Sequence, residues 1–226
     1  HRVNVGGTVC VLEAARDYDL TVYAPSSIAV FGPDSPRIAP QVTPLNPTTM
    51  YGKTKVTGEI LAMNYWKQYG VDVRGIRYPG LVSWKAPAGG GTTDYAVDIF
   101  HSAIEDGHYD CFVREDTKLP MMYMDDAIRG TISLMEAPSE SLGPSRAGYN
   151  LGGMSFTAGE LADAISERIP GFTCDFVPDV RQEYADSWPD DVDDSTARDE
   201  WDWEPEYDLG KMVDEMLEML RPTQSS

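Results

Sequence analysis

The sequence predicts an α/β fold built on parallel strands. Three consecutive segments indicate it: residues 20–24 are a short apolar run, residues 48–69 have the length and pattern of a helix, and residues 71–77 are a second apolar run. Thr48 is a suitable N-cap for this helix, and Gly70 is a suitable residue to end it. A strand, a helix and a second strand at these lengths predict a right-handed crossover between parallel strands.

The other elements are predicted from local patterns. Residues 1–16 have apolar residues at helical spacing, but no N-cap precedes them, so they resemble a helix cut from a longer sequence. Residues 33–47 are proline-rich and predict a loop. Further helices are predicted at residues 95–106, 125–135 and 157–168, from about 193, and near the C-terminal end, with a strand at residues 149–153.

The composition predicts a globular protein with an acidic surface. The 226 residues include 42% hydrophobic residues, enough for a core, and 37 acidic against 18 basic residues give a formal charge of -19. This charge argues against nucleic acid and anionic membranes as partners, because their phosphates carry the same sign. Adaptation to high salt and an ordinary acidic cytosolic protein both explain the acidity, and loss of structure at low salt would favour the first.

The three cysteines form no recognisable disulfide or metal pattern. Cys10, Cys111 and Cys174 are odd in number and far apart, with no Cys-x-x-Cys and no His at ligand spacing. We therefore expect three buried, reduced thiols and no metal site. No apolar run approaches the roughly 20 residues that span a bilayer, and no signal peptide opens the chain, so a soluble, cytoplasmic protein is expected.

The most informative feature is a Tyr and a Lys four residues apart. On a helix Tyr51 and Lys55 share one face, and Ser26 and Ser27 follow the predicted upstream strand at its carboxyl end, where parallel sheets bind ligands. A nearby ammonium could lower the phenol pKa from its ordinary value of about 10. The phenolate could then take the proton of a substrate alcohol whose oxygen a serine binds. Tyr-x-x-x-Lys alone is common, and a solvated Lys beside a half-buried Tyr is the competing interpretation.

Several motifs occur in an order that is typical of one known family. In sequence order they are Asn4-Val5-x-Gly7-Thr8, Ser26-Ser27, Tyr51-x-x-x-Lys55, Arg77-Tyr78-Pro79-Gly80, Asp125-Asp126-Ala127 and Tyr149-Asn150-Leu151-Gly152-Gly153. Together they resemble the extended short-chain dehydrogenase/reductases, the NAD-dependent epimerase/dehydratase-like proteins. Within them the chain is most similar to the short-chain L-threonine 3-dehydrogenases, in residues 25–33, 77–80, 87–97, 119–123 and 183–189.

The resemblance implies the C-terminal part of a Rossmann-type doubly wound parallel sheet, with a smaller, interleaved substrate-binding α/β region. It assigns residues 1–83 and 121–153 to the NAD-binding Rossmann domain, and residues 84–120 and 154–226 to the substrate-binding region. In the family a glycine-rich turn that binds the dinucleotide pyrophosphate precedes the part matched here. We therefore expect an N-terminally truncated sequence and do not assume that these 226 residues are active alone.

The resemblance also implies roles for individual residues, with NAD as cofactor. Tyr51 would be the general base, Lys55 would bind the nicotinamide ribose and lower the pKa of Tyr51, and Ser27 would bind the reacting oxygen. The remaining implied contacts are to the cofactor from Tyr78, Pro79 and Leu81, and to the substrate from Ser26, Thr93 and Trp188. For Trp188, core packing is an equally good interpretation.

The implied reaction is oxidation of the L-threonine 3-hydroxyl to 2-amino-3-ketobutyrate, in a homodimer formed through the helices that contain Asn4 and Tyr51. Two alternatives remain open. A nucleotide-sugar epimerase or dehydratase shares the Ser and Tyr-x-x-x-Lys set, although residues 89–94 argue against it. A non-catalytic NAD-binding module of the same fold would have no chemical need for the intact Ser, Tyr and Lys set.

Overall fold

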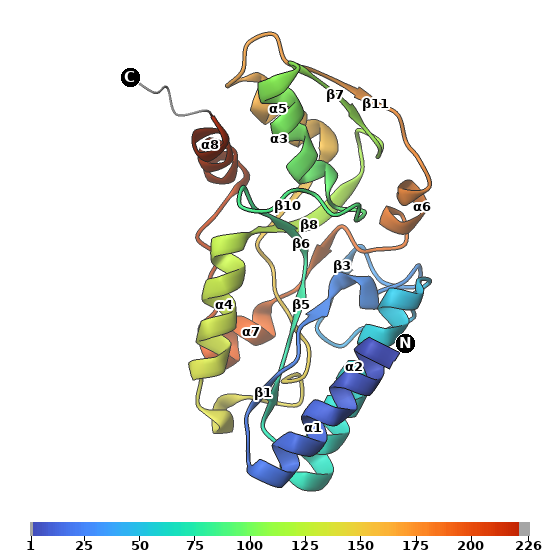
Figure 1. The fold of residues 1–226 in the computed structure, drawn as a ribbon, viewed down its shortest axis with the longest axis vertical. Coiled ribbons are helices and arrows are strands. Elements are labelled where there is room, and N and C mark those ends of the chain that lie inside the picture. The colour runs from blue at the N-terminus through green and yellow to red at the C-terminus, as the bar shows by residue number, and fades with distance from the viewer. Residues whose placement is uncertain (1, 222–226) are drawn as a thin grey trace.

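The computed structural model describes residues 2–221, and parallel strands between two layers of helices lie at its centre (Figure 1). Strands β1 (Val22–Tyr23) and β4 (Val73–Arg74) form a two-stranded parallel sheet, and β2 (Ser26–Ser27), β5 (Ile76–Tyr78) and β9 (Tyr149–Asn150) form a three-stranded one with β5 in the middle. Helices α1 (Gly7–Tyr18) and α2 (Met50–Tyr69) pack on one face, and α4 (Met124–Glu136) packs on the other. The prediction of an α/β fold with parallel strands is confirmed.

A second region contains the remaining longer strands. Its strands are β6 (Gly80–Val82) parallel to β8 (Lys118–Tyr123), β10 (Met154–Thr157) antiparallel to β8, and β7 (His108–Cys111) parallel to β11 (Thr173–Phe176). Its helices are α3 (Tyr95–Glu105), α5 (Ala158–Ser166), α6 (Arg181–Ala185) and α8 (Leu209–Leu220). Thr157 and Glu160 form a capping box at the start of α5, and Met212 and Met216 of α8 are buried in the core.

The remaining elements of the described residues are short. They are the π-helical turn η1 (Arg2–Gly6), the 3-10 turns η2 (Ile28–Val30) and η3 (Ser139–Ser141), the pair β3 (Ile38–Ala39) with β12 (Asp191–Val192), and α7 (Ser195–Trp201). Strand β3 lies in the segment that the sequence predicts as loop. No helix among the described residues is long and apolar enough to cross a membrane.

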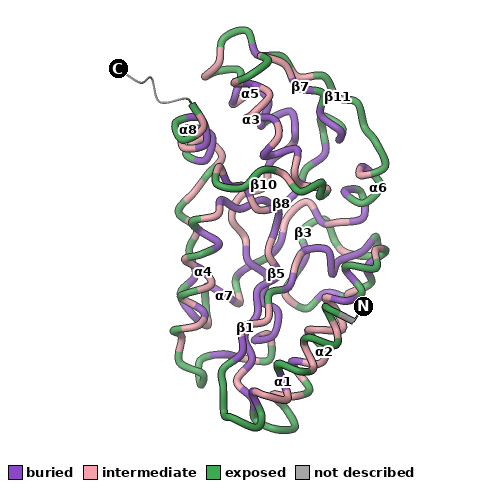
Figure 2. Tube along the Cα trace, viewed as in Figure 1, coloured by how far each residue is buried: buried purple, intermediate pink, exposed green. Residues whose placement is uncertain are grey.

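Buried residues occur in both regions (Figure 2), and the apolar ones form separate clusters. One cluster joins α3, α5 and α8 to the strands of the second region, and another joins α4 to β5 and β9. Helix α7 contributes Ala197 and Trp201 to the cluster under α4, although its sequence lies within residues 154–226. The predicted domain division stays a prediction, and α7 shows that the C-terminal part of the chain packs against both regions.

Helix α2 begins one residue later than predicted. Thr49, not Thr48, is the N-cap, because its backbone is extended and its Oγ1 accepts a hydrogen bond from the Gly52 amide at 3.0 Å. Gly70 ends the helix at a φ of 73°, as predicted. A Cβ on Gly52 would lie 2.1 Å from the Ala29 carbonyl oxygen, so only glycine allows the first turn of α2 to approach η2 this closely.

Two further predictions need correction. The strand predicted at residues 71–77 is divided into β4 and β5 at Gly75, whose amide donates to the Arg146 carbonyl at 2.7 Å instead of to a neighbouring strand. Of the three cysteines only Cys111 is buried, while Cys10 is exposed and Cys174 is partly exposed. Cys10 is exposed because the buried face of α1 carries Leu12 and Ala15 instead.

A buried ion pair attaches α2 to the sheet. The side chains of Glu59 on α2 and Arg77 on β5 are each 9% exposed, and Arg77 donates from Nη2 and Nε to the Glu59 carboxylate at 2.8 and 3.0 Å. Ser26 donates its hydroxyl to Glu59 Oε1 at 2.5 Å. Arg77 Nη1 also donates to the Gln41 carbonyl and to Asn150 Oδ1. One buried polar network thus joins α2, β2, β5 and β9.

We expect Arg77→Met to lower the free energy of unfolding by about 3 to 5 kcal/mol, because it leaves the Glu59 carboxylate buried without its partner. Urea unfolding monitored by circular dichroism measures the change. Arg37→Met is the matched control, since Arg37 is 84% exposed in its pair with Asp190 and the loss should be about 1 kcal/mol or less. Equal unfolding midpoints for the two variants would contradict the prediction.

Candidate active site

The candidate site lies where β2 and β5 end, beside the first turns of α2. Ser27 and Tyr78 are paired in register at the carboxyl ends of these parallel strands. The close approach at Gly52 brings the start of α2 against the turn that follows Ser27. The serine pair lies at a strand end as predicted, but it forms the short strand β2 itself instead of following a strand at residues 20–24. This edge of the sheet is where open α/β folds bind ligands.

The Tyr51 phenol lies beside the Ser27 side chain. Tyr51 is 51% exposed, and its hydroxyl lies close enough to the Ser27 hydroxyl for the serine to influence the pKa of the phenol. Partial burial raises the pKa of Tyr51 above its ordinary value, and the Ser27 side chain opposes this shift. Ser27 Oγ also accepts the Ala29 amide at 3.2 Å, which fixes the serine as the N-cap of η2. The structure therefore brings the predicted base and the predicted oxygen ligand together.

Lys55 lies one turn along α2 from Tyr51. Its ammonium is 5.6 Å from the centre of the Tyr51 ring and donates to the Pro25 carbonyl at 2.7 Å. Burial lowers the pKa of Lys55, and the Glu59 carboxylate opposes that shift. The expectation that Lys55 lowers the pKa of Tyr51 stays a prediction, because the net pKa of Tyr51 is raised in this structure. The reason is that burial disfavours the charged form of both groups.

Polar groups of α1, η1 and α2 line a cavity of about 210 Å³ next to Lys55. Asn4 lies in the π-helical turn η1, and its Nδ2 donates to Thr54 Oγ1 at 3.1 Å, while Thr54 Oγ1 donates to the Tyr51 carbonyl at 2.7 Å. Turns of π-helix are frequent at functional sites. The sequence analysis assigned Asn4 to a family motif and to the predicted dimer contact, but not to the site. Its place in the motif Asn4-Val5-x-Gly7-Thr8 is the signal that could have identified it as a site residue.

Two of the predicted contact residues have their hydroxyl groups engaged elsewhere. The Ser26 hydroxyl is buried on Glu59. The Tyr78 hydroxyl is hydrogen bonded to Tyr23 and to Thr131 of α4, so it lies on the face of the sheet opposite α2. Pro79 directly follows β5 and is buried, and Leu81 lies in β6 and is half-buried.

Thr93 and Trp188 come from more distant parts of the chain. Thr93 packs against Gly80, where an added Cβ would lie 2.8 Å from the Thr93 Cβ, so Thr93 lies beside the end of β5. Trp188 is half-buried and packs against the apolar cluster that contains Ile28 and Phe31, shortly after Ser27. Both residues are thus placed near the strand ends, while their contacts to a substrate stay predictions.

Comparisons with known proteins agree with this arrangement. An uncharacterized epimerase/dehydratase from Staphylococcus aureus (strain USA300) is 50% identical over 220 residues, which are 96% of this chain and 68% of that protein. A GalE-like L-threonine dehydrogenase from Cupriavidus necator in its holo form is 52% identical, with a TM-score of 0.95 over 97% of this chain and 71% of that one. A monomeric L-threonine 3-dehydrogenase from a metagenome is 52% identical, with a TM-score of 0.93 over 96% and 70%.

The sequence model that describes the NAD dependent epimerase/dehydratase family matches residues 1–152. This match covers the parallel sheet, helix α2 and the convergence of Ser27, Tyr51 and Lys55. The family resemblance predicted from the motifs is confirmed. The chain belongs to the NAD-dependent epimerase/dehydratase family.

Proposed function

We propose that this chain carries the catalytic residues of an NAD-dependent L-threonine 3-dehydrogenase, which oxidises the threonine 3-hydroxyl to 2-amino-3-ketobutyrate. The observation that carries the proposal is the convergence of Ser27, Tyr51 and Lys55 at one strand end. Further support comes from the high structural similarity to L-threonine dehydrogenases of 52% identity.

Each residue has a role that its contacts suit. The Ser27 hydroxyl would bind the substrate oxygen, and Tyr51, as phenolate, would accept the hydroxyl proton while a hydride leaves the same carbon. NAD, when bound, supplies the acceptor for that hydride. Lys55 fits the ribose end of such a cofactor, because its half-buried ammonium and the Asn4 amide line one small cavity and both donate hydrogen bonds. The Ser26 side chain would act through Glu59 by holding α2 against the strand.

The raised pKa of Tyr51 has a consequence for the reaction. Without ligands the phenol is protonated at neutral pH, because burial raises its pKa above the ordinary value of a phenol. The base form becomes more abundant as pH increases, so the rate of oxidation should increase with pH into the alkaline range. A cation near the phenol would move this increase to lower pH, which is the role proposed for Lys55.

We expect Tyr51→Phe to lower kcat for L-threonine oxidation by about 100-fold or more, the usual contribution of a positioned general base. The assay follows NADH absorbance with saturating L-threonine and NAD. It is run on this chain and on a version extended at its N-terminus with the preceding segment of the Cupriavidus necator protein. Tyr69→Phe is the matched control, since Tyr69 is on the same helix and is 53% exposed. Equal rates for the two variants would rule out Tyr51 as the base.

We expect Lys55→Met to shift the alkaline increase in kcat upward by about one pH unit, because it removes a positive charge that favours the phenolate. A pH-rate profile measures the midpoint, and Lys53→Met is the control because Lys53 is exposed on the same helix. An unchanged midpoint with a higher KM for NAD would assign Lys55 to cofactor binding alone.

The two alternatives give different outcomes in the extended protein. Thermal stabilisation by UDP-sugars but not by L-threonine would favour a nucleotide-sugar epimerase or dehydratase. Binding of NAD without NADH formation from any amino alcohol would favour a non-catalytic module. Stabilisation by L-threonine together with NADH formation would support the proposed reaction.

We also propose a homodimer formed through α1 and α2. These helices carry exposed apolar side chains, among them Val11 at 53% and Ile60 at 56% exposure. Burial of such residues is the main source of interface stability.

We expect Ile60→Glu to convert the dimer into a monomer in size-exclusion chromatography with light scattering, because it places a charge in the interface. Ile128→Glu on α4 is the matched control, since Ile128 is 50% exposed on the other helical layer. A monomeric parent protein, like the metagenome relative, would contradict the dimer.

A further inference from the structure

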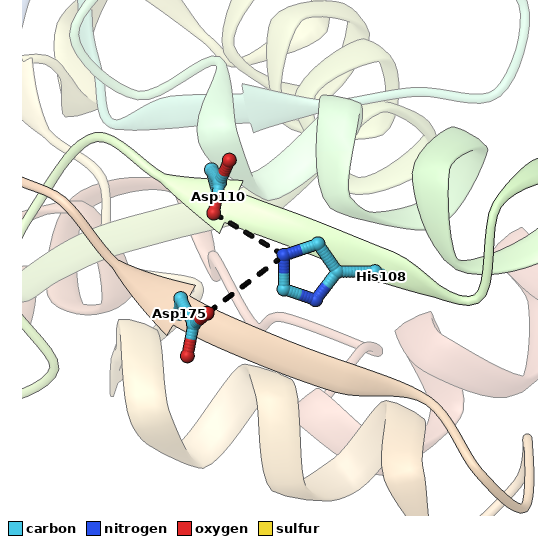
Figure 3. Close-up of side chains that lie close together, drawn as sticks. All are labelled: His108, Asp110 and Asp175. Carbon is cyan, nitrogen blue, oxygen red and sulfur yellow. Dashed lines mark hydrogen bonds and ion pairs between the residues drawn. The ribbon is translucent and has the colours of Figure 1, made fainter.

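Three metal-ligating side chains lie together on strands β7 and β11, away from the candidate active site (Figure 3). Nε2 of His108 is 3.2 Å from Oδ1 of Asp110 and 3.9 Å from Oδ2 of Asp175. One ligand atom from each residue lies within 4.8 Å of the other two, and among residues 2–221 this is the only such group of His, Cys, Asp and Glu. Both carboxylates point toward the same ring nitrogen.

The pairing of the two strands creates this group. Strands β7 and β11 are parallel, with His108 opposite Thr173 and Asp110 opposite Asp175. Since alternate residues of a strand share a face, these four polar side chains lie on one face of the pair. The other face, with Cys111 buried in the apolar core, holds the strands in place. The ligand atoms are therefore carried by regular strands, which position a site better than loops do.

We propose that His108, Asp110 and Asp175 bind a first-row divalent cation of the zinc type. In tetrahedral geometry, metal-ligand distances of about 2.0 to 2.2 Å place neighbouring ligand atoms about 3.3 to 3.6 Å apart. The 3.2 Å and 3.9 Å pairs lie just below and just above this range, and the exposed Asp175 side chain is free to adjust. Water molecules would complete the coordination.

The surroundings of His108 favour an imidazole ligand. Its Nδ1 is 2.8 Å from Thr173 Oγ1, so an Nδ1-H that donates to this hydroxyl leaves the lone pair of Nε2 directed at the two carboxylates. A ligand set of one nitrogen and two oxygens suits zinc, manganese, cobalt or nickel, whereas calcium and magnesium prefer oxygen alone. The formal charge of -19 further raises the cation concentration near the surface.

The site is open, which limits its affinity. The side chains of Asp110 and Asp175 are 69% and 76% exposed, and only three ligands come from the protein. Structural zinc sites have four protein ligands and exclude water. An exchangeable cation is therefore expected here, and the competing interpretation is a simple ion pair of His108 with two aspartates.

Calorimetric titration of the whole chain with ZnCl2 tests the proposal. Every protein carries His1→Asn, because His1 is a second imidazole that zinc could bind. We expect one zinc per chain, and Asp175→Asn and His108→Asn should each lower its affinity at least about tenfold, since even the loss of an outer partner costs about 10- to 100-fold. Asp163→Asn is the matched control, because it removes one exposed carboxylate from α5 and should leave the affinity unchanged.

A second readout identifies the ligand atoms. Substoichiometric MnCl2 should selectively broaden the imidazole proton signals of His108 in NMR spectra, and excess MgCl2 should leave the zinc titration unchanged. The absence of saturable zinc binding would overturn the proposal. An equal loss of affinity in Asp163→Asn would show attraction by the acidic surface, and unchanged affinity in His108→Asn would show zinc bound elsewhere; both results would also overturn it.

Discussion

The buried pair of Glu59 and Arg77 is the interaction on which the candidate site depends. Glu59 lies one turn after Lys55 on α2, and it also accepts the hydroxyl of Ser26, the neighbour of Ser27. Both charged groups are nine-tenths buried, so they depend on each other and not on water for stabilisation. A movement of α2 away from the sheet would separate the two charges and is therefore unfavourable. The pair therefore fixes the helix that carries Tyr51 relative to the strand that carries Ser27.

A steric constraint acts at the other end of the same helix. The close approach of Gly52 to the Ala29 carbonyl sets the distance between the first turn of α2 and the turn after Ser27. The resulting partial burial raises the pKa of Tyr51 and lowers that of Lys55. The contacts that orient the two residues thus also favour their neutral forms. A ligand that changes the burial of Tyr51 would therefore also change the pKa of this phenol.

Local sequence patterns correctly predicted the structural features that depend only on residues close together in the chain. The shared face of Tyr51 and Lys55 follows from helical spacing, and the helix end at Gly70 follows from backbone preference. The partners of Ser26 and Tyr78 could not be predicted, because Glu59 and Thr131 lie 33 and 53 residues further along the chain. These two hydroxyls were assigned to ligands from motif order alone, whereas the fold gives each of them a partner within the protein.

The same limit explains why the sequence indicates no metal site. A search for ligand spacing finds nothing around His108, since Asp175 is 67 positions away and reaches it only through the parallel register of β7 and β11. Parallel pairing has a different effect in the two regions of the protein. At β2 and β5 it gathers Ser27 and Tyr78 where the strands end, and Thr131 of α4 engages the Tyr78 hydroxyl there. At β7 and β11 it aligns alternate side chains along one face. A His and two carboxylates therefore converge on regular strands and not on loops.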